Sequence, residues 1–263
     1  MPELPEVETV VRSLLPYIRG RTILHAELRS HLVTRGQFAL TETALAGAIV
    51  QQIRRRGKQI FIDLNRGFLY IHLGMTGKLL WNAQPGKYTR ALLELDTGTL
   101  LFDDVRQFGR FEFFVDVPPQ IANKGPDALS IEFEEFYSRL RQRRGVIKAV
   151  LLNQSFVAGI GNIYADELLF AAHVHPRAMV RRISKARARK IYDRMRELLE
   201  LAVRMRGSSI SDYVDSAGNA GAFQNLHRVY GRSGMPCLSC GTAIRRVVVA
   251  QRGTHYCPRC QRA

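Results

Sequence analysis

The chain has 263 residues, enough for two modest domains, and its hydrophobic (46%) and charged (24%) fractions are those of a globular protein. No apolar run approaches the roughly 20 residues that a membrane-spanning helix needs, and none follows a signal-peptide pattern. Composition therefore excludes an integral membrane protein and a wholly disordered chain, and it argues against secretion.

The net charge of +16 is unusually high and lies in one half of the chain. Residues 1–138 contain 16 basic and 16 acidic side chains, whereas residues 139–263 contain 23 basic and 7 acidic ones. A one-sided basic excess of this size indicates a polyanionic partner, most often nucleic acid, with a surface charged for solubility as the alternative. No basic amphipathic segment with bulky apolar anchors supports binding to a membrane surface.

The first 18 residues predict a helix. Proline in its first turn and acidic residues around it suit the positive end of a helix dipole. Apolar residues then recur at helical spacing until Gly20, namely Val7, Val10, Val11, Leu14, Leu15 and Ile18. Such a helix would hold the chain terminus in place by packing.

From residue 22 the pattern changes to short strand-like runs separated by glycine turns. The strands are predicted at residues 60–64, 68–73, 92–95, 100–102 and 111–115, with turns at 65–67 and 96–98. This succession favours an antiparallel β-sandwich, so we expect residues 1–116 to form an α+β domain of one helix and a sandwich.

Residues 117–131 are rich in proline and glycine and predict a linker. Beyond it the periodicity is helical, which predicts a second domain over residues 132–226. Helices are expected at residues 132–142, 146–153, 162–172 and 184–205, followed by a mobile loop over 207–221 that is rich in glycine, serine, aspartate and asparagine.

The four cysteines of the chain lie in residues 227–263, as two Cys-x2-Cys pairs that are separated by 16 residues: Cys237, Cys240, Cys257 and Cys260. This spacing favours one tetrahedral, structural Zn2+ site, with disulfides as the alternative that an intracellular protein disfavours. Two short strands around a glycine turn would connect the pairs as a hairpin, with Arg252 at its tip. So small a segment needs the metal for much of its folding free energy.

Several motifs, in order from residue 2 to residue 260, resemble those of the formamidopyrimidine-DNA glycosylases, bacterial enzymes that remove oxidised purines from DNA. They are the N-terminal Pro-Glu-Leu-Pro-Glu, residues 55–58, 72–77, 105–109 and 159–165, and the four-cysteine segment. The resemblance implies a β-sandwich joined to a helix-two-turn-helix domain with a C-terminal zinc finger. That architecture agrees with the pattern-based prediction.

The N-terminus offers a nucleophile and an acid. Removal of Met1 would leave Pro2 with a secondary amine. In a fraction of the molecules this amine is neutral at pH 7, and it can then attack the C1′ atom of a damaged nucleotide. The iminium that results has no N–H proton to lose, so it remains an electron sink for eliminating the flanking phosphates. Glu3, next to the amine, is the candidate general acid–base for the sugar and the departing base.

Further roles come from the resemblance. It implies that Lys58 donates a proton in β-elimination and that Arg252 acts in δ-elimination, where we read the guanidinium chiefly as a phosphate clamp. A nucleotide must leave the stack to be excised, and the family fills the gap with side chains that match Met75, Arg106 and Phe108. Residues 216–224 match the loop that covers the lesion.

Phosphate contacts are predicted on both sides of the linker. Asn162 stands at a glycine-rich helix start, where free amides favour an anion, and the other candidates beyond the linker are Arg144, Lys148 and Arg232. Before the linker, many family members carry His-x-His after a lysine, whereas this chain has Tyr88 and Arg90 at those positions. We assign these two residues to DNA phosphate as well.

The residues and the resemblance together predict a bifunctional glycosylase and AP lyase that binds duplex DNA containing 8-oxoguanine or formamidopyrimidines. We expect a monomer in the bacterial cytoplasm, associated with the nucleoid. Two alternatives stay open: an enzyme of the same fold for oxidised pyrimidines, and a zinc-ribbon DNA-binding protein without catalysis. The pyrimidine enzymes usually have glycine where this chain has Leu4 and lack the Met75 and Phe108 pair.

Overall fold

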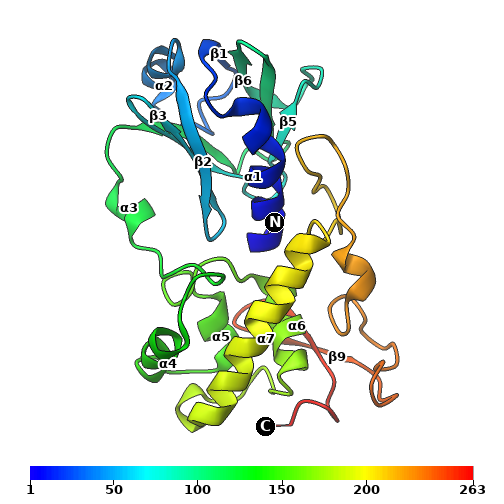
Figure 1. Cartoon of the computed structure of the whole chain (residues 1–263). Helices are drawn as coiled ribbons and strands as arrows, with labels where there is room; N and C mark the ends of the chain where they lie inside the picture. The colour runs from blue at the N-terminus through cyan, green and yellow to red at the C-terminus, as the bar shows by residue number, and fades with distance from the viewer. Residues whose placement is uncertain (263) are drawn as a thin grey trace. The chain divides into compact units, whose positions relative to one another are not determined.

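The computed structural model describes residues 1–262, with Gln120 described in its backbone only. The chain forms two compact units (Figure 1). Unit 1 comprises Met1–Ala122 and Met205–Ala222, and unit 2 comprises Asn123–Arg204 and Phe223–Ala263.

Helix α1 (Leu4–Ile18) opens unit 1, as the apolar spacing predicted. Its first turn is closed by a capping box: the Glu3 side chain accepts from a backbone N–H of the first turn, and the Glu6 carboxylate accepts from the Glu3 N–H at 2.8 Å. Pro5 stands in this turn, where its missing N–H costs no helical hydrogen bond. The start of α1 is therefore held by the sequence of its own first turn.

Two four-stranded antiparallel sheets follow, with strand orders β1-β6-β7-β5 and β2-β3-β4-β8. Their bounds are β1 (Ile23–Leu28), β2 (Val50–Arg56), β3 (Gln59–Leu64), β4 (Gly67–His72), β5 (Lys78–Trp81), β6 (Thr89–Leu95), β7 (Gly98–Asp103) and β8 (Arg110–Phe114). Helix α2 (Phe38–Leu45) joins β1 to β2. The sequence missed β1, β2, β5 and α2; β2, for example, buries only Val50 and Ile53 and carries three arginines, so its apolar signal is weak.

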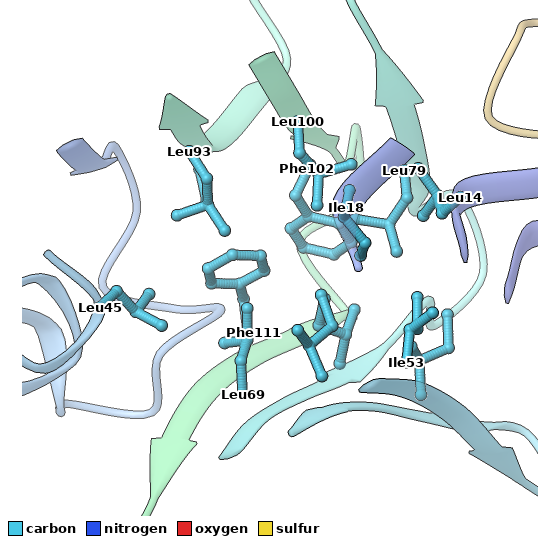
Figure 2. Packing of buried hydrophobic residues seen from close by; sticks show 14 of the residues in the cluster. Leu14, Ile18, Leu45, Ile53, Leu69, Leu79, Leu93, Leu100, Phe102 and Phe111 are labelled. Carbon is cyan, nitrogen blue, oxygen red and sulfur yellow. The ribbon is translucent and has the colours of Figure 1, made fainter. Parts of the chain in front are cut away.

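The predicted sandwich is confirmed by a shared apolar core (Figure 2). One sheet supplies Ile53, Leu69 and Phe111, and the other supplies Leu79, Leu93, Leu100 and Phe102. Leu14 and Ile18 of α1 lie in the same cluster, so the helix is packed against the sheets along its length. Burial of this extent holds α1 as a rigid element.

Unit 2 contains the predicted helices. They are α4 (Phe133–Arg141), α5 (Ile147–Leu152), α6 (Asn162–Ala171) and α7 (Lys185–Arg204), with 3-10 turns at Val180–Arg182 and Phe223–Leu226. Phe136 packs on Phe156 and Tyr192, with ring centroids 5.4 and 5.7 Å apart, and so connects α4 to α7. The zinc-finger segment ends the unit with the hairpin of β9 (Arg245–Val249) and β10 (Arg252–Tyr256).

The division of the chain differs from the sequence prediction in two places. Residues Met205–Ala222, which we expected in the helical domain, belong to unit 1, where the backbone N–H of Trp81 donates to the Ser216 carbonyl at 2.8 Å. The expected linker starts with a short helix, α3 (Pro119–Ala122), whose Ile121 is buried with Phe61, Phe68 and Tyr70. Tertiary contacts place both segments in unit 1. The sequence does not predict this, because neither segment has an apolar period of its own.

Candidate active site and metal centre

Pro2 and Glu3 lie at the N-terminal end of α1, and both are buried. The capping box directs the Glu3 carboxylate to the backbone of the first helical turn and sets its position next to Pro2. The predicted general acid–base is therefore a fixed carboxylate next to Pro2, and its catalytic role stays a prediction.

Glu6 joins the start of α1 to the base of the loop Met205–Ala222. One of its oxygens accepts from the Glu3 N–H, and the other accepts from the Ser208 N–H at 2.7 Å. A Cβ atom on Gly207 would lie 2.6 Å from Glu6 Oε1, so glycine is needed for this approach. In the sequence, Glu6 is one of the acidic residues that suit the first turn of a helix, and nothing near it in the chain indicates its hydrogen bond to residue 208.

The same loop is held again further along α1. Ser216 and Ser13 share a hydrogen bond of 2.7 Å between their hydroxyl oxygens, and Tyr213 donates to the Arg206 carbonyl at 3.0 Å. Burial raises the pKa of Tyr213, so its hydroxyl stays protonated and able to donate. The segment expected to be a mobile loop is thus connected to the helix that carries Pro2 and Glu3.

Lys58 stands at the tip of the β2–β3 hairpin and is largely buried. The preceding Gly57 has φ +61°, which the two-residue turn requires. Arg55 connects this hairpin to α1 by donating to Glu8 at 2.7 Å. Burial raises the pKa of Glu8, but Arg55 and Arg12 together outweigh burial and hold the pKa below its ordinary value. Glu8 is therefore a charged partner of the hairpin.

The three predicted intercalating residues are exposed on two loops of unit 1. Met75 follows β4, while Arg106 and Phe108 lie between β7 and β8. The Arg106 guanidinium lies 4.6 Å from the centroid of the Phe108 ring. Tyr88 is exposed nearby in the chain before β6, and Arg90 donates to the Asp104 carbonyl at 2.9 Å. Large exposed apolar side chains on well-held loops suit a surface that enters another molecule.

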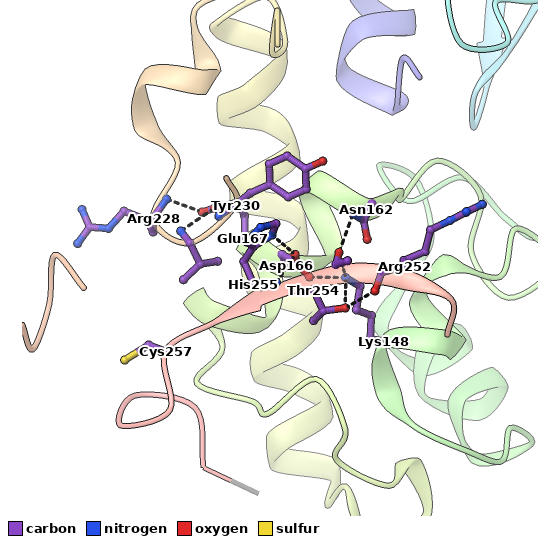
Figure 3. A network of polar contacts seen from close by, with 12 residues as sticks. Lys148, Asn162, Asp166, Glu167, Arg228, Tyr230, Arg252, Thr254, His255 and Cys257 are labelled. Carbon is purple, nitrogen blue, oxygen red and sulfur yellow. Dashed lines mark hydrogen bonds and ion pairs between the residues drawn. The ribbon is translucent and has the colours of Figure 1, made fainter. Parts of the chain in front are cut away.

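Arg252 is exposed next to the tip of the zinc hairpin, in unit 2. The turn differs from the expected glycine turn: Ala250 and Gln251 form it with φ +50° and +59°, and Gly253 lies within β10. Gly253 lies against the Arg246 side chain, and a Cβ atom there would stand 2.9 Å from the guanidinium, so a larger residue would displace that side chain. Its carbonyl accepts from the Asn162 side chain at 2.9 Å, which places the start of α6 beside Arg252 (Figure 3).

The position of Lys148 differs from the phosphate contact that we expected. Its ammonium is fully buried, pairs with Asp166 at 2.5 Å and donates to Thr254 at 2.8 Å (Figure 3). A buried, paired ammonium does not reach solvent, so this lysine connects α5 and α6 to β10. The arginines and the glycine that precede Lys148 are typical of an exposed basic segment. The packing of α5 buries the lysine, and the sequence does not indicate this.

Asp166 and Glu167, which the sequence did not single out, hold the C-terminal segment on α6. Asp166 accepts from the backbone N–H of His255 at 2.8 Å, and Glu167 accepts from three consecutive N–H groups, those of Arg228, Val229 and Tyr230 (Figure 3). Burial raises the pKa of Glu167, and the three N–H groups oppose that rise. The sequence signal that could have identified these two residues is a pair of adjacent acids in an otherwise largely apolar helix.

The remaining predicted phosphate contacts lie in unit 2. Arg144 is exposed before α5 and Arg232 is half-buried, with its guanidinium donating to the Pro236 carbonyl at 3.1 Å. Nothing in the structure tests a role of Arg144, Arg232, Asn162, Tyr88 or Arg90 in DNA binding, so these assignments stay predictions.

The four cysteines form one cluster, with all their sulfur atoms within 4.8 Å of one another. Cys237 and Cys257 are buried, and Cys240 and Cys260 are partly exposed. Four thiolates at this spacing fit a tetrahedral zinc ion, and the backbone N–H groups of Ser239 and Cys260 lie 3.4 Å from sulfur, as in zinc knuckles. The donor set therefore fits the metal that the spacing predicted.

Comparison with known proteins agrees with this geometry. The profile of the formamidopyrimidine-DNA glycosylase N-terminal domain matches residues 1–111, that of the H2TH domain of the same enzyme matches residues 124–214, and that of a zinc finger found in FPG and IleRS matches residues 234–263. A formamidopyrimidine-DNA glycosylase of Solibacter usitatus is 53% identical over the whole length of both chains. The chain belongs to the formamidopyrimidine-DNA glycosylase family.

Solved structures of the family superpose closely on this chain. The MutM (Fpg) protein of Thermus thermophilus is 40% identical with a TM-score of 0.89, and the match covers 99% of this chain and 98% of that one. A mutant Fpg of Lactococcus lactis in complex with DNA containing Fapy-dG is 34% identical, with a TM-score of 0.91 and full coverage of both chains. The predicted family and fold are confirmed. None of the helices in residues 1–262 has the length and apolar character to cross a membrane.

Proposed function

We propose that this protein is a bifunctional DNA glycosylase and AP lyase that excises oxidised purines, 8-oxoguanine and formamidopyrimidines, from duplex DNA. The observation that carries the proposal is the N-terminus: Pro2 and Glu3 are buried at the start of a capped helix in a chain of this family. Relatives of this fold have been solved with DNA containing Fapy-dG and with DNA containing an abasic site, which supports damaged duplex DNA as the partner.

The chemistry begins after removal of Met1. The Pro2 nitrogen attacks C1′ of the damaged nucleotide, and the base leaves with the N-glycosidic electron pair while Glu3 moves protons at the sugar. Loss of the sugar ring oxygen from C1′ leaves an iminium between C1′ and Pro2. Abstraction of a C2′ proton then expels the 3′ phosphate, and a second elimination expels the 5′ phosphate.

Other residues assist these steps. Lys58, largely buried at its hairpin tip, supplies a proton during β-elimination, and Arg252 clamps the phosphate that leaves in δ-elimination. Ser216 and its neighbours cover the expelled base, and the connection of this loop to Glu6 and Ser13 supports that role. Met75, Arg106 and Phe108 fill the gap in the stack.

The zinc-finger segment would hold one structural zinc through Cys237, Cys240, Cys257 and Cys260, and the metal would fix the hairpin that carries Arg252. DNA phosphate would be bound by Tyr88, Arg90, Arg144, Asn162 and Arg232, so affinity should fall steeply with salt. We place the protein as a monomer in the bacterial cytoplasm with the nucleoid.

The proposal is tested by trapping the covalent intermediate. Borohydride added to the protein and a duplex with 8-oxoguanine should give a stable adduct, and peptide mapping should place it on Pro2. The matched control is the same chain with one extra N-terminal residue that is not removed, because the Pro2 nitrogen is then an amide without nucleophilicity. An adduct that forms equally well with the extended chain would refute the role of Pro2.

A Pro2→Gly variant separates chemistry from binding. It should lose most base excision while its affinity for lesion-containing DNA stays within about twofold, because no phosphate contact is changed. A panel of lesion duplexes under single-turnover conditions distinguishes the alternatives: preference for oxidised pyrimidines would assign the chain to that branch, and DNA binding without any adduct would indicate a non-catalytic protein.

A further inference from the structure

Asp104 is a fully buried carboxylate directly after β7, at the start of the loop that carries Arg106 and Phe108. Neither the pattern of the sequence nor the chemistry of excision assigns it a role. A buried acid needs partners that offset the cost of its desolvation, and the hydrogen-bond donors to the Asp104 carboxylate all belong to this loop and to the loop that carries Met75.

Each oxygen of Asp104 accepts from a loop donor. Oδ1 accepts from the Thr76 hydroxyl at 2.5 Å and lies 3.3 Å from the Arg106 backbone nitrogen, and Oδ2 accepts from the Gly109 N–H at 2.8 Å. The Thr76 hydroxyl in turn accepts from the Arg106 N–H at 3.1 Å. Thr76 directly follows Met75, so the carboxylate joins the loop of Met75 to both ends of the loop of Arg106 and Phe108.

The backbones of the two loops are also in close contact. A Cβ atom on Gly74 would lie 2.7 Å from the Phe108 carbonyl carbon and from the Gly109 nitrogen. Gln107, between Arg106 and Phe108, has φ +54°, which costs a non-glycine residue conformational energy, and its side chain accepts from the Ser30 hydroxyl at 2.6 Å. The loop geometry is thus held from three sides without DNA.

The Met75 and Phe108 side chains are exposed, whereas the carboxylate that holds their loops is buried. Met75 and Phe108 are 42% and 54% exposed, and Asp104 is 0% exposed. Residues that must enter a base stack lose less conformational entropy on binding when their backbones are already ordered. A preformed wedge is expected to have exposed apolar side chains on loops whose backbones are held by buried polar contacts.

We infer that Asp104 is a positioning residue: its carboxylate holds the loops of Met75 and of Arg106 and Phe108 as one preformed wedge for opening duplex DNA. The inference rests on the proposed function for the role of the wedge, and on the contacts above for its preformed state. Asp104 itself touches neither substrate nor the reacting atoms in this assignment.

The test is Asp104→Asn, which replaces one acceptor oxygen with an NH2 group that faces backbone N–H donors. Two substrates are compared in single turnover: a duplex with 8-oxoguanine opposite cytosine, and a preformed abasic site opposite a one-nucleotide gap, where no stack must be opened and no orphan base is left. We expect excision from the duplex to slow about 10- to 100-fold, and cleavage at the gapped abasic site to stay within about twofold of the unmodified protein.

Asp103→Asn is the matched control. Asp103 is the neighbouring residue and accepts from Thr89 of β6 at 2.7 Å, away from the wedge loops. The same change of carboxylate to amide there should leave the ratio of the two rates unchanged. Equal slowing of both substrates by Asp104→Asn would overturn the inference in favour of a merely structural role, and so would no slowing at all.

Two further measurements keep the inference testable. Thr76→Val removes the two hydrogen bonds of the Thr76 hydroxyl, the one it donates to Asp104 and the one it accepts from the Arg106 N–H, and leaves the carboxylate in place. This variant should give the same selective slowing, several-fold, if Asp104→Asn does not fold. Hydrogen–deuterium exchange of the free protein should show the Arg106 and Gly109 amides protected, and unprotected amides would refute the preformed wedge. Absence of excision and cleavage in the unmodified protein would instead refute the proposed function and leave the exchange result standing.

Discussion

The two units hold their functional residues by different means. In unit 1, Pro2 and Glu3 stand on a helix whose apolar face is buried in the core that both sheets share. In unit 2, the hairpin of Arg252 rests on a small apolar cluster, Phe170, Val229, Ile244, Cys237 and Cys257, in which two of the five buried residues are cysteines. The first region is therefore stabilised by buried apolar area, whereas the second relies on a few polar contacts and on a four-cysteine cluster that fits a metal ion.

This contrast has a consequence for sensitivity to mutation. An apolar core loses stability in proportion to what is removed, because neighbouring side chains repack in part. A metal site or a buried ion pair fails as a whole when one partner is lost, because the groups that remain are left buried without compensation. The zinc hairpin should thus be the more fragile of the two regions.

Loss of zinc should have the largest effect, because it should unfold the hairpin of unit 2 and leave unit 1 folded. Chelation, or Cys257→Ser, should abolish the protection of residues 234–262 against hydrogen exchange and remove incision of abasic DNA. Trp81, the single tryptophan, stacks on Tyr17 in unit 1 and should keep its fluorescence. A hairpin that stays protected with zinc shown to be absent would contradict the fragility that we assign to it.

Lys148→Met should have the next largest effect. The variant leaves the Asp166 carboxylate buried with His255 as its partner, and unit 2 should lose about 3–5 kcal/mol of stability in denaturant unfolding followed by helical ellipticity. Lys185→Met is the control, since Lys185 pairs with Glu134 on the surface and its loss should cost less than about 1 kcal/mol. Equal effects of the two changes would mean that the buried pair does not hold the hairpin.

The smallest effect should come from pH at His227. Burial lowers the pKa of His227 to about 4 from an ordinary 6.5, so the unfolded chain binds a proton between these values that the folded chain does not. Its contribution to stability is complete above about pH 6.5, declines as the pH falls towards 4, and does not change further below that. Protection factors of residues 223–230 at pH 7 and pH 5, with zinc content checked at both, should show the loss.

His227→Phe is the matched variant for the pH measurement. The ring of His227 packs against Phe223 and Tyr230, with centroids 5.6 and 5.7 Å away, so phenylalanine keeps the packing and removes the titration. The pH dependence of residues 223–230 should become weaker in this variant. Unchanged dependence would assign it to another group.

Much of this protein could be predicted from its sequence where the signal is local. Apolar spacing placed α1 and the long helices of unit 2, because one face of each is buried. The pairs of cysteines predicted their cluster, because thiolates two residues apart within a knuckle reach one ion. The weakly patterned strands β1, β2 and β5 escaped prediction, because their burial depends on strands that come later in the chain.

The sequence by itself determined the family, the longer helices, the strongly apolar strands and the four-cysteine cluster, since all of these follow from residue types at short, regular spacing. The tertiary structure alone decided which polar groups meet: Glu6 with Ser208, Lys148 with Asp166, and Asp104 with Thr76, Arg106 and Gly109. Arg106 and Gly109 lie within five residues of Asp104, whereas the other partners lie 18 to 202 residues apart in the chain. A carboxylate or ammonium carries no periodic signal of the partner it will have. Each of these charged groups acquires its structural role only when folding buries it against its partner.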